Sequence, residues 1–257
     1  MGPECMTLLI KDDPDSGVVF EQAEGIATIT LTRKRMSLKM LEALAGVPEF
    51  VAKSNARVLT LQSAGDDFCH GIDLSDSEIL GSVQADQGRS VAALGGQVVK
   101  RWCELSIPTI AVISNWTIGA GACLVFACDF RFATPLARVS FPEIDRGMHL
   151  SWGILPRLVQ ECGVSMTRRL AMLGDPVSVE EFPVDTFTVT QNLTDDAHEF
   201  AARLAEKPPE ALQHIKSVLA SSSPTNDQID EDVRRFVDSV SSPGFAQAMA
   251  DWFSGKR

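Results

Sequence analysis

The sequence predicts a mixed α/β fold that is followed by a helical C-terminal region. Strand and helix patterns alternate over roughly the first 190 residues, and only helical patterns occur after them. The chain has 257 residues, of which 45% are hydrophobic and 22% are charged, so it can bury a large core. An alternating βαβα order predicts a mostly parallel sheet with crossover helices. We therefore expect residues 1–190 to form the α/β core and residues 191–257 to form a helical region.

The elements of the first half follow from β-rich runs and from apolar residues at helical spacing. Residues 25–32 (GIATITLT) are β-rich and are expected to pair with residues 18–21 in a hairpin that turns at Gly25. Residues 57–61 (RVLTL) form a nearly continuous apolar run, which is typical of a strand buried on both faces. Further strands are expected at residues 109–114 and 129–133, and helices at residues 38–52, 91–105 and 119–128.

The second half contains helical patterns only. The helices are expected at residues 151–162, 165–173, 195–206, 208–220, 228–240 and 245–253. The loops SSSPTND and SSPG separate the last three of them, because Ser, Pro and Gly clusters favour turns.

Net charge and cysteine usage exclude several classes of protein. The chain has 23 basic and 34 acidic residues and a formal charge of −11, so a nucleic acid is not an expected partner. Its six cysteines are scattered without a CxxC or Cys/His pattern, which indicates reduced thiols in a cytoplasmic protein rather than disulfides or a metal site. The first residues carry acids and lack a basic-then-apolar layout, so they are not expected to be a signal peptide.

One uncharged stretch has almost the length of a membrane span. Residues 105–128 contain no charged side chain, and about 20 apolar residues cross a bilayer. Pro108, Asn115 and Gly119 interrupt this stretch. We therefore expect a buried strand, a turn and a buried helix, and no membrane partner.

The first segment with chemical potential is residues 64–74 (AGDDFCHGIDL). It follows a predicted buried strand and so lies at the carboxyl end of that strand, where ligands bind in open α/β sheets. Gly71 allows the backbone to turn so that the amide of Ile72 points outward as a free donor. An ordinary strand-to-helix loop is the alternative.

The second segment is residues 115–128 (NWTIGAGACLVFAC), in which a strand runs into GAG and then into a helix. The start of a helix offers unpaired N–H groups and the positive end of the helix dipole, which can hold an anion or the oxyanion of a carbonyl group. The alternative is close packing of helix on strand, which needs small residues. The glycines match neither a dinucleotide-binding nor a P-loop pattern, so nucleotide binding is not predicted.

The third segment is residues 139–152 (VSFPEIDRGMHLSW), where Glu143 stands in a largely apolar stretch. A carboxylate among apolar groups has a raised pKa and can carry a proton. The alternative is a surface glutamate that pairs with Arg146. Taken together, two backbone donors and one carboxylate suit a reaction that passes through an enolate.

These segments resemble the crotonase (enoyl-CoA hydratase/isomerase) superfamily from about residue 17 to residue 174. The matching runs are VLTLQSAGDDFCHGIDL, IPTIAVISNWTIGAGACLVFACDFRFAT and SFPEIDRG…WGILPRLV, in the family's order and spacing. The resemblance implies a spiral of ββα repeats with a C-terminal helical trimerisation region, and assembly as a homotrimer or a dimer of trimers. It also implies an acyl-CoA or acyl-carrier-protein substrate, with coenzyme A or phosphopantetheine as part of the thioester and no required cofactor.

The resemblance also implies the roles of particular residues. The family's catalytic glutamate is matched by Glu143, and its oxyanion donors are matched by the amides of Ile72 and Ala120, the second of which is usually a glycine. Residues expected to bind coenzyme A are Lys34, Arg35, Phe253 and Lys256. Residues expected near the acyl group are His70, Cys123, His149, Ser151 and Trp152.

One departure from the family narrows the reaction. Family hydratases use two glutamates, and the first of them would stand at Cys123. A thiol in an apolar helix is poorly ionised and does not hold a water molecule as a carboxylate does. A single glutamate, Glu143, therefore favours double-bond isomerisation or decarboxylation over hydration. His70 and His149 are candidates for a second acid or base, and an ordinary loop or packed histidine is the alternative for each.

Three hypotheses follow for the function. The first is an acyl-thioester enzyme that stabilises an enolate and carries out isomerisation or decarboxylation. The second is an enoyl-CoA hydratase, or a polyketide-pathway enzyme that acts on acyl chains held by a carrier protein. The third is a non-catalytic acyl-CoA binding scaffold, which Cys123 and the altered MHLSW segment suggest.

Overall fold

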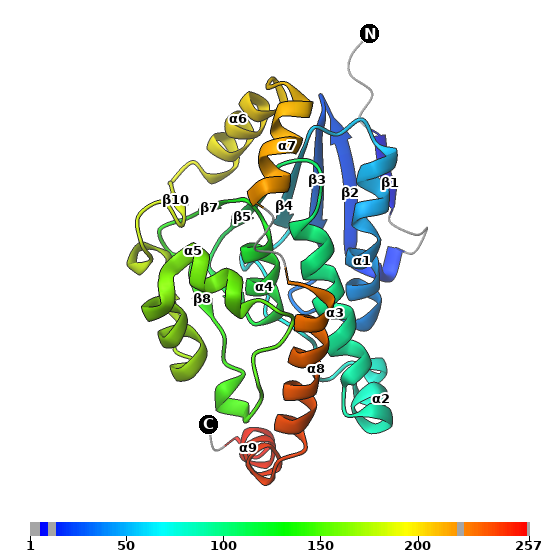
Figure 1. Ribbon diagram of the computed structural model, residues 1–257, viewed down its shortest axis with the longest axis vertical. Helices are drawn as coiled ribbons and strands as arrows, with labels where there is room; N and C mark the ends of the chain where they lie inside the picture. Colours follow the sequence, from blue (N-terminus) through cyan, green and yellow to red (C-terminus); the bar gives the residue numbers. More distant parts are fainter. Residues whose placement is uncertain (1–5, 10–13, 220–223, 256–257) are drawn as a thin grey trace.

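The structure is a computed structural model that describes residues 6–9, 14–219 and 224–255. Its larger sheet has the strand order β1-β2-β3-β4-β5-β7-β10 (Figure 1). The strands are β1 (Met6–Leu9), β2 (Val18–Ala23), β3 (Ile26–Leu31), β4 (Val58–Ser63), β5 (Thr109–Ile113), β7 (Phe130–Ala133) and β10 (Thr188–Val189). The first three strands are antiparallel, and each later pair of neighbours is parallel. The parallel order of β3, β4, β5 and β7 is as the alternating pattern predicts, whereas β1 and β10 were not predicted, and β10 lies in the half of the chain that was expected to be helical only.

The predicted hairpin is confirmed between β2 and β3. Its turn contains Glu24 and Gly25, whose φ angles are +51° and +79°. Two consecutive positive φ angles match the right-handed twist of the flanking strands, and a glycine at the second position adopts that conformation without strain. The hairpin aligns Ala23 with Ile26 and places Phe20 and Ile29 together in the core.

A second, smaller sheet was not predicted from the sequence. It contains β6 (Trp116–Ile118), β8 (Arg138–Ser140) and β9 (Val177–Ser178) in the order β6-β8-β9. Strands of two or three residues are too short to show a periodic pattern. This small sheet positions the candidate site, because β6 leads directly into the helix that begins at Ala120 and β8 leads to Glu143.

The helices cover both faces of the larger sheet. They are α1 (Leu38–Lys53), α2 (Ser77–Asp86), α3 (Arg89–Cys103), α4 (Ala120–Ala127), α5 (Leu155–Arg168), α6 (Leu193–Ala205), α7 (Pro209–Leu219), α8 (Asn226–Val240) and α9 (Pro243–Phe253). The main core lies between the sheet and α1, α3 and α4. On the opposite face, α6 places Ala197, Ala201 and Ala205 against side chains of β3, β4 and β5. The division of the chain at residue 190 stays a prediction.

The structure corrects the prediction of a helix over residues 151–162. Residues 151–154 are not helical, since Trp152 and Gly153 have φ angles of +71° and +67°. The helix α5 begins at Leu155, is broken at Gly163 (φ +76°), and continues to Arg168. A π-helical turn then covers residues Arg169–Leu173. The predicted end of the helix over residues 208–220 lies outside the described residues, which end in α7 at Leu219.

The helix α2 was also missed. It buries only Ile79, so its sequence lacks a clear apolar stripe. Its start depends on a polar contact, because the Oδ1 atom of Asp76 accepts hydrogen bonds from the backbone amides of Glu78 (3.0 Å) and Ile79 (2.9 Å). Within the described part of the chain, no helix is both long enough and apolar enough to cross a membrane.

A buried lysine attaches α7 to the larger sheet. The Nζ atom of Lys216 donates hydrogen bonds to the backbone oxygen of Ile107 (2.7 Å) and to Oδ2 of Asp129 (2.6 Å). The same carboxylate oxygen accepts from the amide and the hydroxyl group of Thr109, at 2.8 and 2.9 Å. Lys216 is only 8% exposed. Its charge is therefore neutralised inside the protein rather than by water.

We expect Lys216→Met to lower the free energy of unfolding by about 3 kcal/mol, because it leaves the Asp129 carboxylate without its counter-ion. The measurement is urea denaturation at pH 7. The matched control is Lys100→Met, which removes a more exposed pair with Glu104 and should change the value by less than about 0.5 kcal/mol. Equal losses in the two variants would show that the Lys216 contact does not stabilise the fold.

Candidate active site

The Glu143 carboxyl group lies against the backbone at the start of α4. Glu143 follows β8 by three residues and precedes the short 3-10 turn Ile144–Arg146. A Cβ atom built on Gly119 would lie 2.8 Å from Oε1 of Glu143. Gly119 also has a φ angle of +54°, which L side chains rarely adopt. A glycine is therefore needed at position 119 both for the turn and for the approach of the carboxyl group.

The environment of Glu143 favours its neutral form. Burial raises the pKa of Glu143 to about 7, and the weaker influences of its own backbone amide and of Arg146 act in the opposite direction. The Oε2 atom is buried and has no hydrogen-bond partner among the described residues. The alternative of a surface glutamate paired with Arg146 is wrong, since no ion pair between the two is present in the described structure. A carboxyl group of this kind can both accept and donate a proton near neutral pH.

The amide of Ile72 is left free by the hydrogen bonds on either side of it. The amide of Met36 donates to the oxygen of Gly71, and the amide of Asp73 donates to the oxygen of Met36, each at 2.8 Å. No acceptor within the described residues faces the amide of Ile72 itself. Gly71 has a φ angle of +79°, as expected for the turn that exposes the next amide.

The amide of Ala120 is free for a different reason, because it is the first residue of α4. No acceptor within the described residues faces it. A Cβ atom on Gly71 would lie 3.4 Å from the nitrogen of Ala120 and 3.0 Å from the oxygen of Ile118, so the two loops touch. The structure thus brings Ile72, Ala120 and Glu143 together at one place. Two free amides beside one carboxyl group can hold an oxyanion and move a proton next to it.

Cys123 lies one turn into α4 and is buried. Burial raises the pKa of its thiol well above the ordinary value, and the carboxylates of Glu143 and Asp232 raise it further. The thiol is therefore neutral, and it does not replace the second glutamate of a hydratase as an acid or base. Asp232 belongs to α8.

Asp232 is the residue that the sequence analysis missed. Its Oδ1 atom lies 2.8 Å from Nε2 of His149, and its Oδ2 atom accepts from the amide of Gly153 at 2.8 Å. The hydroxyl oxygen of Ser239, also on α8, accepts from the amide of His149 at 2.9 Å. One helix therefore holds both ends of the segment 149–153. The available signal was an acid on the otherwise apolar stripe of α8, between Ile229 and Val233.

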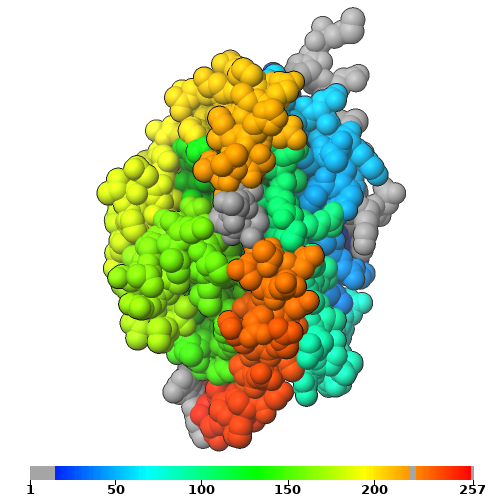
Figure 2. All heavy atoms as spheres, in the orientation of Figure 1, coloured from blue at the N-terminus to red at the C-terminus, as the bar shows by residue number. Residues whose placement is uncertain are grey.

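The segment that Asp232 holds contains two other predicted site residues. Ser151 and Trp152 are both buried. The indole of Trp152 covers Gly95 of α3, where a Cβ atom would lie 1.9 Å from Cε2. Trp152 therefore packs this segment against α3. In the space-filling view, α8 runs along the surface beside the green residues that follow β8 (Figure 2).

His70 and the basic residues near position 34 form a separate cluster. Asp67 accepts from Nζ of Lys34 at 2.8 Å and lies 3.1 Å from Nε2 of His70. The hydrogen bond from Lys34 lowers the pKa of Asp67 and outweighs its partial burial. Arg35 lies 4.0 Å from Asp73. His70 therefore pairs with Asp67 rather than with Glu143.

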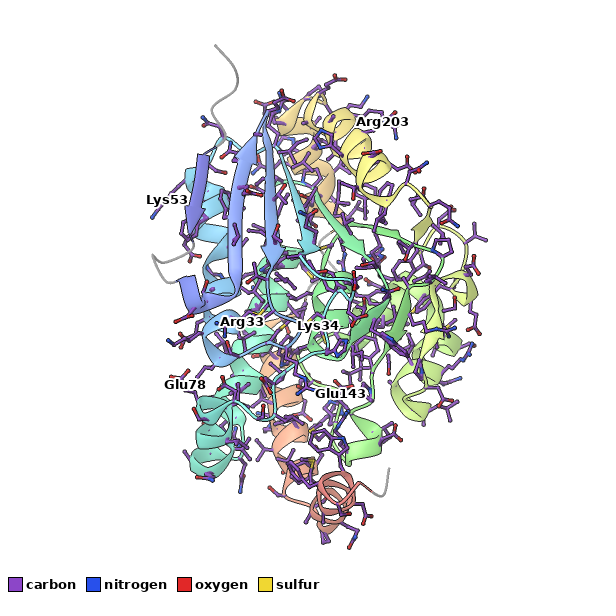
Figure 3. The ribbon with its side chains drawn as sticks, turned by 180° about the vertical axis from the view of Figure 1, so that it is seen from behind. Arg33, Lys34, Lys53, Glu78, Glu143 and Arg203 are labelled. Atoms are coloured by element: carbon purple, nitrogen blue, oxygen red, sulfur yellow. The ribbon has the colours of Figure 1, made fainter. Side chains whose placement is uncertain are left out.

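A cavity of ≈190 Å³ lies beside this cluster, lined by residues 31–34, 63–65, 67 and 68. It is at the carboxyl ends of the parallel strands β3 and β4. Figure 3 shows Lys34 and Glu143 on the same side of the molecule, below the ends of these strands. A larger hollow of ≈570 Å³ lies between α5 and α8 and borders Asp232, but Glu143 and the two free amides do not line it.

The C-terminal helix α9 lies next to the turn that follows Glu143. A Cβ atom on Gly147 would lie 2.9 Å from Cα of Phe245, and the guanidinium carbon of Arg146 is 5.4 Å from the ring centre of Trp252. Phe253, a predicted coenzyme A contact, is 69% exposed and packs its ring against that of Trp252. Lys256 lies outside the described residues.

The raised pKa of Glu143 predicts a pH-dependent stability. The folded protein keeps a proton up to about pH 7 that the unfolded chain releases near its ordinary value of 4.5. Stability is therefore lost as the pH rises through this window, by up to about 3 kcal/mol above it. Glu143→Gln should be more stable than the wild type in urea denaturation at pH 8 and nearly equal to it at pH 4.5. The control is Glu199→Gln, at an exposed site on α6, which should show no such difference.

Known proteins resemble this chain in sequence and in structure. Residues 21–253 match the family model for enoyl-CoA hydratase/isomerase. Human ethylmalonyl-CoA decarboxylase is 26% identical over 214 residues, which cover 78% of this chain and 69% of that protein. The short-chain-enoyl-CoA hydratase of Clostridium acetobutylicum is 24% identical over 216 residues, which cover 79% of this chain and 81% of that protein.

Solved structures confirm the fold. A putative enoyl-CoA hydratase/isomerase from Acinetobacter baumannii superposes with a TM-score of 0.82 at 20% identity, covering 93% of this chain and 98% of that one. An enoyl-CoA hydratase from Bacillus halodurans gives a TM-score of 0.81 at 20% identity, covering 91% and 99%. The expected crotonase-type α/β architecture is therefore confirmed. Because the family model spans most of the sequence, this chain belongs to the enoyl-CoA hydratase/isomerase family.

Proposed function

We propose that the protein acts on acyl thioesters by forming an enolate, with Glu143 as its single acid–base group. The observation that carries this proposal is the buried, unpartnered carboxyl group of Glu143 beside the free amide of Ala120. In this proposal the amides of Ile72 and Ala120 donate hydrogen bonds to the thioester oxygen. These donors stabilise the negative charge that develops on the oxygen as the enolate forms.

Glu143 then moves the proton. In its ionised form it removes a proton from the α or γ carbon, and in its neutral form it returns one. A pKa of about 7 keeps both forms populated at neutral pH, so the same group can serve in both steps. This cycle is sufficient for double-bond isomerisation, and its second half is sufficient for the protonation that completes a decarboxylation.

Hydration is the less favoured reaction. Addition of water across a double bond needs a second group that positions the water, and the neutral thiol of Cys123 stands where family hydratases carry that glutamate. His149 and His70 are each held by an aspartate, Asp232 and Asp67. The name of the human relative, ethylmalonyl-CoA decarboxylase, is consistent with a decarboxylase.

The carrier of the acyl group is proposed to be coenzyme A or a protein-bound phosphopantetheine arm. Lys34 lines the ≈190 Å³ cavity, and Arg35 follows it in the sequence. The positive charges of both side chains suit the phosphate groups of such a carrier. We also propose a cytoplasmic protein that forms a homotrimer or a dimer of trimers through residues 191–257. Large apolar side chains on α7, namely Ile215, Val218 and Leu219, are 59%, 73% and 68% exposed, which supports an interface there.

The first test is α-proton exchange of butyryl-CoA in deuterium oxide, followed by NMR. Wild-type exchange should increase with pH through about 7 as Glu143 ionises. Glu143→Gln should lower the rate by about 1000-fold while butyryl-CoA still binds, because only the base is lost. Glu199→Gln should behave as the wild type. Full exchange activity in Glu143→Gln would disprove the assignment of the base.

The second test removes one oxyanion donor. Ala120→Pro deletes the N–H group at the first position of α4, where proline is tolerated. The expected loss of exchange is about 100- to 1000-fold. Ser77→Pro makes the same change at the first position of α2, a helix that carries none of the three proposed catalytic residues, and should keep the wild-type rate. A folded Ala120→Pro variant with a rate within about threefold of the wild type would contradict the role of this amide.

A non-catalytic acyl-CoA binding protein is the second candidate. The observation that favours it is Cys123, which leaves the site with one carboxyl group. This candidate predicts that the wild-type protein binds butyryl-CoA in calorimetry but catalyses no exchange. The same experiment therefore separates the two functions.

A further inference from the structure

Two unsatisfied polar groups occur on the same turn of the chain. In the described residues, four buried side-chain atoms lack a hydrogen-bond partner, namely Thr117 Oγ1, Thr134 Oγ1, Glu143 Oε2 and Arg146 Nε. Glu143 and Arg146 are three residues apart, and neither satisfies the other. Burying an unpaired hydroxyl group costs little free energy, whereas burying an unpaired carboxyl or guanidinium group costs much more. We therefore expect a bound ligand to supply the missing partners of these two groups.

The guanidinium group of Arg146 is held in place without being neutralised. Its Nη1 atom donates to the oxygen of Pro142 at 3.2 Å, and its face lies 5.4 Å from the ring centre of Trp252 on α9. Neither Nε nor Nη2 donates to another described residue, and no ion pair of Arg146 is found within the described chain. An arginine keeps its charge at any physiological pH. Its Nε–Nη2 edge is therefore a fixed, positively charged pair of donors.

This edge matches one kind of ligand group. Two parallel N–H donors on a guanidinium group fit the two oxygens of a carboxylate. Glu143 immediately precedes the 3-10 turn Ile144–Arg146, so the charge of Arg146 stands three residues from the acid–base carboxyl group on the same turn. A ligand carboxylate at Arg146 is therefore expected on the carbon at which Glu143 works, or next to it.

We propose that Arg146 binds a carboxylate carried by the α-carbon of the acyl group, so that the substrate is a malonyl-type thioester. This inference rests on the proposed enolate chemistry and names the substrate class for the same site. The arginine selects and orients the substrate. Because it holds a carboxylate that is present before the reaction, it contributes mainly to binding and little to the rate of the chemical step.

The reaction of such a substrate is a decarboxylation. The bond between the α-carbon and its carboxylate breaks, and carbon dioxide leaves. The electron pair of that bond forms the enolate, whose oxygen lies between the amides of Ile72 and Ala120. The neutral carboxyl group of Glu143 then gives its proton to the α-carbon and regains one from water. The products are carbon dioxide and the saturated acyl thioester, and no oxidant or reductant is needed.

The test compares two thioesters that differ only by the carboxylate, ethylmalonyl-CoA and butyryl-CoA. Decarboxylation of the first is followed by NMR, and α-proton exchange of the second is measured in deuterium oxide. In Arg146→Gln, the KM for ethylmalonyl-CoA relative to that for butyryl-CoA should rise by about 10- to 100-fold, with kcat for ethylmalonyl-CoA within about threefold of the wild type. Arg146→Lys keeps the charge but loses the paired donors, so its KM ratio should lie between those of the wild type and Arg146→Gln.

The matched control is Arg203→Gln. Arg203 also stacks on an aromatic ring, that of Phe200 at 5.4 Å, but lies near the top of the molecule in Figure 3, whereas Glu143 lies below the centre. It should keep the wild-type KM ratio. If Arg146→Gln does not fold, the wild-type protein alone still tests the inference. The inference predicts that the wild type binds ethylmalonyl-CoA at least about tenfold more tightly than butyryl-CoA.

Three results would overturn the inference. A wild-type protein that exchanges butyryl-CoA but neither binds nor converts ethylmalonyl-CoA would disprove the substrate class and leave the proposed function intact. Equal effects of Arg146→Gln on both thioesters would show that Arg146 only positions the turn of Glu143. A wild-type protein that converts neither thioester would refute the proposed function itself.

Discussion

The contact between the Glu143 carboxyl group and the bare backbone of Gly119 is the constraint on which the rest of the site depends. A side chain at position 119 would collide with Oε1, and the backbone there has a positive φ angle. Gly119 lies between the end of β6 and the first residue of α4, so the free amide of Ala120 and the buried carboxyl group lie together. Burial without a hydrogen-bond partner costs stability when the group is charged, and this cost is what moves the pKa into the range useful for proton transfer.

The C-terminal helices α8 and α9 contact the segments that surround the site. Asp232 and Ser239 on α8 hold the segment 149–153, and α9 packs on the turn that carries Arg146. These contacts join residues that are at least 79 positions apart in the sequence. The helical region therefore has a role beyond covering the sheet, since it determines how the turn after Glu143 and the segment around Trp152 are placed.

Sequence patterns predicted the large elements well because each has its own physical signature. The apolar run at β4 and the glycine turn between β2 and β3 are examples. The patterns failed for short or irregular segments. Residues 151–154 carry apolar side chains at helical spacing, but positive φ angles at Trp152 and Gly153 end any helix there. The indole of Trp152 has its place over Gly95, a contact between elements that local spacing does not contain.

For the site itself, the sequence determined which groups were available. It determined the loop glycines at 71 and 119, the lone glutamate at 143 and the thiol at 123, because backbone freedom and side-chain chemistry belong to each residue alone. Tertiary structure alone decided how those groups behave. In the folded protein Glu143 is buried, His70 pairs with Asp67 and His149 with Asp232, and the Nε–H of Arg146 has no partner among the described residues. Burial and pairing depend on distances between segments that are remote in the chain, and a linear pattern does not carry those distances.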